Sequence, residues 1–150
     1  MTETSLPNAS GFVFERDATH WLLRLSPDEW IRAGLTEVRR AAEAFDARNA
    51  RAGDACAKRG AGMALNGALI VEPDERWGRS YVDHLMALSR DPVVPERVRE
   101  ACRELTLVSA SAGPTLIALR TRSSESRILE AARDIIAHAY AIVARYGGTS

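Results

Sequence analysis

Two stretches decide the fold: Trp30–Phe45, which reads WIRAGLTEVRRAAEAF, and Ala55–Val71, which reads ACAKRGAGMALNGALIV. Both are long and rich in alanine, and their apolar residues recur with the period of an α-helix. In the first stretch the positions expected to face the core are Trp30, Ile31, Leu35, Val38, Ala42 and Phe45. Two adjacent amphipathic helices predict an all-α bundle.

The start of the first helix is marked by Ser26-Pro27-Asp28-Glu29. A serine followed three positions later by a glutamate is typical of a capping box, and proline is favoured at the first helical position. Charged residues between the apolar ones predict the solvent-facing side: Arg32, Glu37, Arg39, Arg40 and Glu43. We expect the chain to turn around residues 49–53.

The second helix, expected over residues 54–71, has small residues along its stripe: Cys56, Gly60, Met63, Gly67 and Ile70. A glycine inside a helix costs about 1 kcal/mol relative to alanine. Two glycines on one face therefore indicate that another backbone approaches closely there. That backbone belongs either to the same chain or to a second copy across a dimer interface.

Three further apolar patterns predict helices over about residues 79–89, from Pro95 onward, and over about residues 124–146. Their inward residues should be Trp77, Tyr81, Leu85 and Leu88, then Val98, Cys102 and Leu105, and finally Ile128, Ala132, Ile135, Ala139 and Ile142. Residues 109–114 are expected to form a loop, and residues 115–119 an extended loop or helical turn. The predicted fold is an all-α, up-and-down bundle of about five helices with the first, second and last at its core. Residues 1–25 should form an N-terminal arm, and residues 26–150 a single domain.

The composition narrows the classes of function. Lys plus Arg and Asp plus Glu both number 20, so a whole-molecule basic field that gathers nucleic acid is absent, although a local patch is compatible with this balance. Cys56 and Cys102 stand far apart inside predicted helices, which favours free thiols in a reduced compartment. The N-terminal residues lack the pattern of a signal peptide, and no apolar stretch is long enough to span a bilayer. We therefore expect a cytoplasmic protein without a membrane partner.

Several segments resemble, in order, the helices of HEPN-type domains. EWIRAGL at Glu29–Leu35 resembles the Trp-containing first helix of that family, and AGMALNGALI at Ala61–Ile70 resembles its second. DHLMAL at Asp83–Leu88 resembles the next segment, and the loop LRTR at residues 119–122 precedes a helix in the place of the last. The resemblance covers about residues 28–146. Positions of the second helix that are charged in the family are here Gly62, Met63 and Asn66.

HEPN-type domains include RNA-cutting toxins, companions of small nucleotidyltransferases and inert dimerisation modules. The resemblance implies a module that binds a nucleotide, RNA or a protein partner such as a nucleotidyltransferase, without catalysis and without a cofactor. The glycine face and the apolar arm Phe12–Trp21 favour a homodimer. The first alternative is a metal-independent endoribonuclease of a toxin–antitoxin or defence system, and the second is a generic helical interaction protein. Zero net charge and the apolar replacements favour the non-catalytic functions.

Ribonucleolytic members of the family carry an Arg-x4–6-His motif, which one toxin branch extends to Arg-x4-His-x-Tyr. The longer form matches Arg133, His138 and Tyr140, and the shorter form matches Arg79 and His84. The resemblance implies that the histidine moves a proton from the ribose 2′-hydroxyl and that the arginine stabilises charge on the phosphorane. The candidate catalytic residues are therefore Arg133, His138 and Tyr140, with Arg79 and His84 as the runner-up pair.

The helical period weighs against the first set. Five residues of a regular helix turn through about 500°, which leaves Arg133 and His138 about 140° apart, whereas Arg133 shares a face with Tyr140. To act together in catalysis, Arg133 and His138 would need a helix irregularity, a long reach of the arginine side chain or residues of a partner subunit. The alternative to a catalytic role is that His138 forms a solvated pair with Asp134, one turn earlier on the helix. For the runner-up, a bend at the helix start could bring Arg79 to its histidine, but that histidine also matches a non-catalytic one of the family.

Two other groups of residues have simpler interpretations. The histidines His20, His84 and His138 lack metal-ligand spacing, so no metal site is expected. A basic rim at the first helix is interpreted as a solvated face, with contact to RNA or phosphate as the alternative; it comprises Arg39, Arg40, Arg48 and Arg51.

Overall fold

The computed structural model describes residues 5–7, 13–15, 21–110 and 122–147. Five α-helices lie within these ranges: α1 (Pro27–Asp46), α2 (Ala50–Val71), α3 (Tyr81–Arg90), α4 (Glu96–Ala110) and α6 (Arg122–Gly147). Short 3-10 helices precede two of them, η1 (Trp21–Arg24) before α1 and η2 (Glu75–Trp77) before α3. The predicted all-α bundle is confirmed.

The connection between the last two helices was predicted only in part. Helix α4 continues through Ser109 and Ala110, which were expected in a loop. The rest of that loop and the segment expected at residues 115–119 lie outside the described residues.

Near the N-terminus, two three-residue strands pair in antiparallel register: β1 (Ser5–Pro7) and β2 (Val13–Glu15), with Leu6 opposite Phe14. The sequence did not predict this pair, because runs of three residues are too short to show the alternation of a strand.

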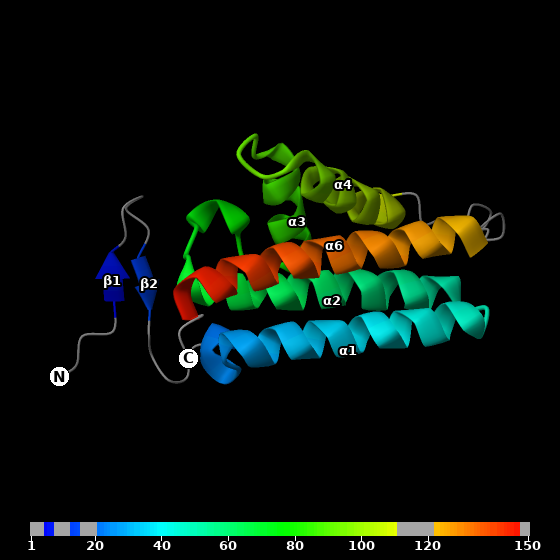
Figure 1. Cartoon of the computed structure of the whole chain (residues 1–150), viewed down its shortest axis with the longest axis horizontal. Coiled ribbons are helices and arrows are strands. Elements are labelled where there is room, and N and C mark those ends of the chain that lie inside the picture. Colours follow the sequence, from blue (N-terminus) through cyan, green and yellow to red (C-terminus); the bar gives the residue numbers. More distant parts are fainter. Residues whose placement is uncertain (1–4, 8–12, 16–20, 111–121, 148–150) are drawn as a thin grey trace.

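The long helices α1, α2 and α6 lie side by side, and α3 and α4 pack on α2 and α6, on the side away from α1 (Figure 1). Helices α1 and α4 run in one direction, whereas α2 and α6 run in the other, as expected for an up-and-down bundle. The capping box that opens α1 is present as predicted: the Glu29 amide donates to Ser26 Oγ (3.1 Å), and the Ser26 amide donates to Glu29 Oε1 (2.8 Å).

The glycines of α2 bring α1 close to it within the same chain. A Cβ atom at Gly60 would lie 2.7 Å from the carbonyl oxygen of Gly34, and one at Gly67 would lie 2.7 Å from the carbonyl oxygen of Pro27. Real Cβ atoms do not approach backbone oxygens so closely, so leucine at either position would force the two helices apart. The glycine face therefore belongs to the intrachain contact between α1 and α2.

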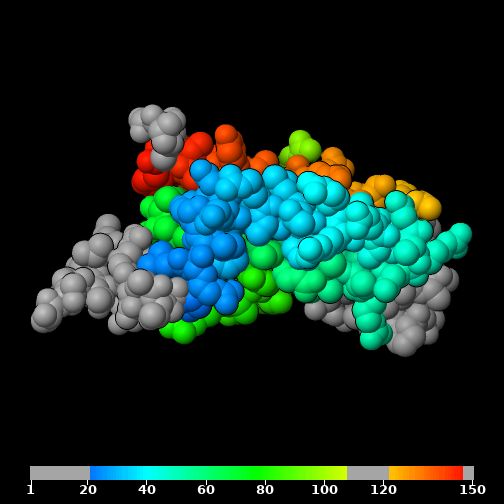
Figure 2. All heavy atoms as spheres, turned by 90° about the horizontal axis from the view of Figure 1, so that it is seen from below, coloured from blue at the N-terminus to red at the C-terminus, as the bar shows by residue number. Residues whose placement is uncertain are grey.

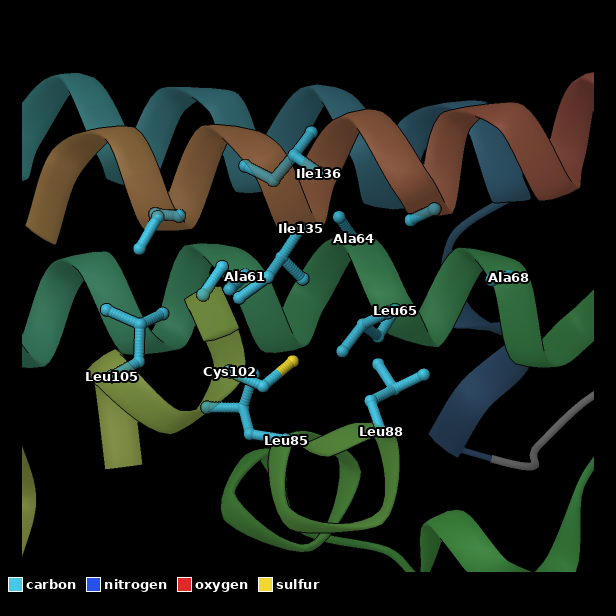
Figure 3. Close-up of a cluster of buried hydrophobic side chains, with 14 of the residues drawn as sticks. Ala61, Ala64, Leu65, Ala68, Leu85, Leu88, Cys102, Leu105, Ile135 and Ile136 are labelled. Atoms are coloured by element: carbon cyan, nitrogen blue, oxygen red, sulfur yellow. The ribbon is translucent and has the colours of Figure 1, made fainter. Parts of the chain in front are cut away.

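The core lies where all the helices meet. Small side chains of α2, namely Ala61, Ala64 and Ala68, are buried beside α6, and Ile135 of α6 points toward α2 (Figure 3). On the other side, α3 and α4 contribute buried apolar residues: Leu85, Leu88, Cys102 and Leu105. The inward residues predicted for α6 are all buried: Ile128, Ala132, Ile135, Ala139 and Ile142. Each large aliphatic side chain removed from water contributes about 1.5–3 kcal/mol.

Two predictions about α1 were wrong. Leu35, expected in the core, is 44% exposed, and Glu37, expected in solvent, is 8% exposed. The reason is the close approach of α2, which places the small residues Gly34 and Ala41 at the contact and turns Leu35 outward. Two arginines bind the buried Glu37 carboxylate, as described below.

Helix α2 begins earlier than expected. Its first residue is Ala50, and the Asn49 side chain caps it by accepting a hydrogen bond from the Ala52 amide (3.2 Å). The turn from α1 is made by few residues, of which Arg48 adopts a positive φ of 64°. The sequence suggested a longer turn because glycine and asparagine around residues 49–53 are also typical of loops.

Candidate functional site

Arg133 and Tyr140 lie on the side of α6 that faces α1. Arg122, at the start of α6, forms an ion pair with Asp46 of α1 (3.0 Å), which identifies that side. In a regular helix, Arg133 and Tyr140 lie within about 20° of Arg122. Both side chains are exposed, and Tyr140 is 59% exposed.

His138 lies on the opposite flank of α6, toward α4. Asp134, one turn earlier, accepts a hydrogen bond from Arg97 Nε of α4 (3.0 Å). Helix α6 is continuous through this region, so Arg133 and His138 remain about 140° apart around its axis. The structure therefore gathers Arg133 with Tyr140 but does not bring Arg133 to His138, and Asp134 pairs with α4 instead of with His138.

The charged groups that act on His138 come from the end of the bundle. Tyr146 Oη donates a hydrogen bond to Glu72 Oε2 (2.6 Å), and Arg145 Nη2 lies 3.4 Å from the same oxygen. Partial burial of the imidazole lowers the pKa of His138, the positive charge of Arg145 lowers it further, and Glu72 opposes both effects. His138 is therefore neutral at neutral pH and able to accept a proton.

His84, the runner-up histidine, is fully buried between η2, α2 and α3. Its Nδ1 lies 2.8 Å from the Trp77 carbonyl oxygen, and its Nε2 lies 2.9 Å from Asn66 Oδ1. The rings of Trp77 and Tyr81 flank it, with centroids 5.9 and 6.3 Å away. With both ring nitrogens engaged, His84 has none left to receive a substrate proton.

The hydrogen bonds of His84 determine its protonation. A neutral imidazole carries one N–H group, yet both facing atoms are acceptors, and Asn66 Nδ2 is buried without a partner among the described residues. Turning the Asn66 amide by about 180° resolves the conflict at His84: Nδ2 then donates to Nε2 of His84, Nδ1–H donates to the Trp77 carbonyl, and Asn66 Oδ1 takes the place of the unpartnered atom. We assign this arrangement, because burial lowers the pKa of His84 and so favours the neutral ring.

Arg79 does not join His84. Its side chain is exposed in the connection before α3, and the bend there is organised by a capping box in which the Asp83 amide donates to Ser80 Oγ (3.0 Å). The bend that the sequence allowed is thus present, but it encloses the histidine instead of exposing it to a substrate. The sequence signal for this outcome was Asn66, a polar residue in the apolar second half of α2.

An ion network around the buried Glu37, between α1 and α2, was missed by the sequence analysis. Glu37 accepts hydrogen bonds from Arg40 Nη1 (2.8 Å) and from Arg59 Nε (3.1 Å), while Arg59 Nη2 lies 3.4 Å from Cys56 Sγ. Both oxygens of the Glu37 carboxylate accept a hydrogen bond, and the network closes the α1–α2 contact beside Gly60.

Cys102 is inert, because burial raises the pKa of its thiol to about 12.

Five residues form an exposed surface between α1 and α6, which we name the α1/α6 face: Arg32, Leu35, Arg39, Arg133 and Tyr140. Figure 2 shows α1 running across the molecule with α6 along one of its edges. None of the three arginines forms an ion pair with another described residue. The sequence analysis recognised Arg39, Arg133 and Tyr140 separately, but it did not join them, because their juxtaposition depends on how α1 and α6 pack.

A groove between α4 and α6 carries charges that are already paired. Arg97 lies 3.0 Å from Asp134 and 3.5 Å from Glu130, and Arg127 lies 4.0 Å from Glu104. In the described part of the chain, no three His, Cys, Asp or Glu residues are grouped so that they could hold a metal ion. No helix among the described residues is long and apolar enough to cross a membrane.

No family model, no curated protein and no solved structure matches the chain.

Proposed function

We propose that the chain is a HEPN-like helical module that acts by binding and does not cut RNA. The observation that carries the proposal is the separation of the two motif histidines from their arginines. Arg133 and His138 lie on opposite flanks of a continuous helix, and His84 uses both ring nitrogens inside the core. Proton transfer and charge stabilisation at one phosphodiester need both groups at the same place.

The order of the helices supports the HEPN-like part of the proposal. Trp30 is buried in the first long helix, and its Nε1 donates a hydrogen bond to the Leu22 carbonyl (2.8 Å). A helix rich in small residues, a short helix containing His84 and a long final helix follow in the order that the resemblance implies. The ligand of such a module would be a nucleotide, RNA or a protein partner such as a nucleotidyltransferase.

We further propose a homodimer formed through the outer face of α3. Val82 and Met86 stand one turn apart there and are exposed, and Val93 in the following turn is 87% exposed. Exposed apolar side chains that lie close together are typical of protein interfaces. The glycine face of α2 is used inside the chain, and most of the arm Phe12–Trp21 lies outside the described residues, so this strip carries the dimer proposal.

Sedimentation equilibrium at micromolar concentration tests the dimer. The wild type should sediment as a dimer, and Met86→Glu should sediment as a monomer, because a charge buried in an apolar interface is costly. Leu107→Glu is the matched control: Leu107 is also exposed, but it lies on α4, so this variant should remain dimeric. A monomeric wild type would refute this part of the proposal.

One observation favours the endoribonuclease as a second candidate. His138 is neutral and half-exposed, and it lies in the field of Arg145, close to the Tyr146–Glu72 pair. If the chain cuts RNA, Arg145→Ala should then reduce cleavage more than Arg133→Ala does. Equal loss in both variants would indicate that a partner subunit brings Arg133 to the site.

A further inference from the structure

We propose that the α1/α6 face binds single-stranded nucleic acid, with its arginines on phosphates and Tyr140 stacked on a base. The proposal rests on the proposed binding function and names its ligand.

The two helices place these side chains along one seam. On α1, Arg32, Leu35 and Arg39 lie within about 40° of Asp46, the residue that pairs with Arg122 of α6. On α6, Arg133 and Tyr140 lie within about 20° of Arg122. Leu35, Arg133 and Tyr140 therefore border the line where α1 and α6 meet, and Arg32 and Arg39 lie beside Leu35 on the outer side of α1.

The antiparallel run of α1 and α6 fixes which residues are neighbours across the seam. Leu35 lies eleven residues before Asp46, and Arg133 lies eleven residues after Arg122, so the two stand opposite each other. Arg32 and Arg39 flank Leu35 by about one helical turn on either side, or about 5–6 Å. The backbone positions of three arginines are thus grouped around one exposed leucine.

These arginines are not neutralised by ion pairs with the rest of the described chain. Nine other arginines are within 4.0 Å of a carboxylate, but Arg32, Arg39 and Arg133 are not. Acidic residues lie about one turn from two of these arginines along α1: Glu29 caps the helix start and interacts electrostatically with Arg32, and the exposed Asp28 and Glu43 form no ion pair with the described arginines of this face. The guanidinium donors of Arg32, Arg39 and Arg133 are therefore not engaged in ion pairs with described residues and can bind a phosphate.

The chemistry of the face suits a flexible strand with unstacked bases. Arginine binds phosphate through a planar pair of donors, and an aromatic ring provides a platform on which a base can stack. Tyr140 stands near one end of the row of arginines and is 59% exposed, so a base can reach its ring. An acidic protein segment would satisfy the arginines but would leave the tyrosine ring without a specific role.

Binding should depend on salt in proportion to the number of phosphate contacts. For three contacts with a single strand, the logarithm of the association constant should fall with the logarithm of salt concentration with a slope of about −2. Removing one arginine should make that slope less steep by about 0.7.

Fluorescence anisotropy of a labelled, uridine-rich RNA oligonucleotide tests the proposal. The triple variant Arg32→Gln, Arg39→Gln, Arg133→Gln should lose nearly all of the salt-dependent affinity, and Tyr140→Ser should weaken binding by at least about fivefold. The matched control is the triple variant Arg24→Gln, Arg90→Gln, Arg127→Gln, which removes the same charge from exposed arginines away from the α1/α6 face. The control should bind like the wild type.

Several outcomes would overturn the proposal. These are absence of binding at low salt, equal loss in the two triple variants, unchanged binding by Tyr140→Ser, or displacement of RNA by polyglutamate as effectively as by unlabelled RNA. A DNA oligonucleotide of the same sequence shows whether the 2′-hydroxyl contributes, and equal affinity for both would assign recognition to phosphates and bases alone. Loss of the dimer or cleavage of the oligonucleotide would instead count against the proposed function, and both are measured separately.

Discussion

The same short motif occurs twice in this chain, and its two copies end in opposite environments. At α3, the histidine of the Arg79/His84 copy is fully buried and bonded at both nitrogens, while its arginine is exposed. At α6, the histidine of the Arg133/His138 copy is half-exposed, and its arginine lies on another side of the helix. The comparison teaches that a spacing of five residues on a regular helix separates two side chains unless the helix or a partner bends to join them.

The largest effect should come from removing the buried histidine. His84→Ala deletes two hydrogen bonds and leaves a cavity beside Asn66, so we expect the free energy of unfolding to fall by about 3 kcal/mol. Urea denaturation followed by circular dichroism measures this change. A loss below about 1 kcal/mol would show that the ring does not hold η2 and α3 against α2 as the structure indicates.

Acidification should produce the next largest effect. Burial lowers the pKa of His84 below its ordinary value of about 6.5, so the folded state binds fewer protons than the unfolded state under mildly acidic conditions. The neutral His84 ring therefore makes its full contribution to the free energy of unfolding above about pH 6.5. This contribution is lost as the pH falls toward the pKa that His84 has in the folded state. Burial shifts the pKa of His138 in the same direction.

Denaturation curves collected between neutral and mildly acidic pH should show this decline. His84→Ala should flatten the decline, and His138→Ala should change it less, because the ring of His138 is less buried. Nitrogen-15 spectra add a direct view of the ring: His84 should appear as the Nδ1–H tautomer at neutral pH. An imidazolium or an Nε2–H tautomer at neutral pH would contradict the assigned orientation of Asn66.

The sequence predicted those parts of the fold that depend on one helix at a time. The capping box at Ser26, the apolar line of α6 and the small residues of α2 are local patterns, and the structure contains all three. The exposure of Leu35 and the burial of Glu37 could not be predicted, because both follow from the rotation of α1 against α2. Helical period indicates which residues share a face, but not which neighbour meets that face.

Prediction of the candidate site was limited in the same way, to residues that share a face of one helix. Period alone predicted that Arg133 and Tyr140 share a face and that His138 does not, and the structure agrees. It could not predict that Arg32 and Arg39 lie across from them, because that depends on the pairing of α1 with α6. The hydrogen bonds that seal His84 join residues of α2, η2 and α3, which are distant in the sequence.

A smaller effect on stability is expected at the second histidine. His138 forms no hydrogen bond with another described residue and is half-exposed, so His138→Ala should change the free energy of unfolding by less than about 1 kcal/mol. The measurement is the same urea titration as for His84→Ala. A loss above about 2 kcal/mol would show a structural histidine and would remove the basis of the endoribonuclease alternative.

The most direct test of binding without catalysis is an RNA cleavage assay on the purified wild type, with His138→Ala prepared in parallel. Labelled single-stranded and structured RNAs are incubated with each protein and separated by denaturing electrophoresis. We predict intact RNA with both proteins, because no arginine of the motif reaches its histidine. Cleavage by the wild type that disappears in His138→Ala would contradict the account and establish the motif on α6 as catalytic.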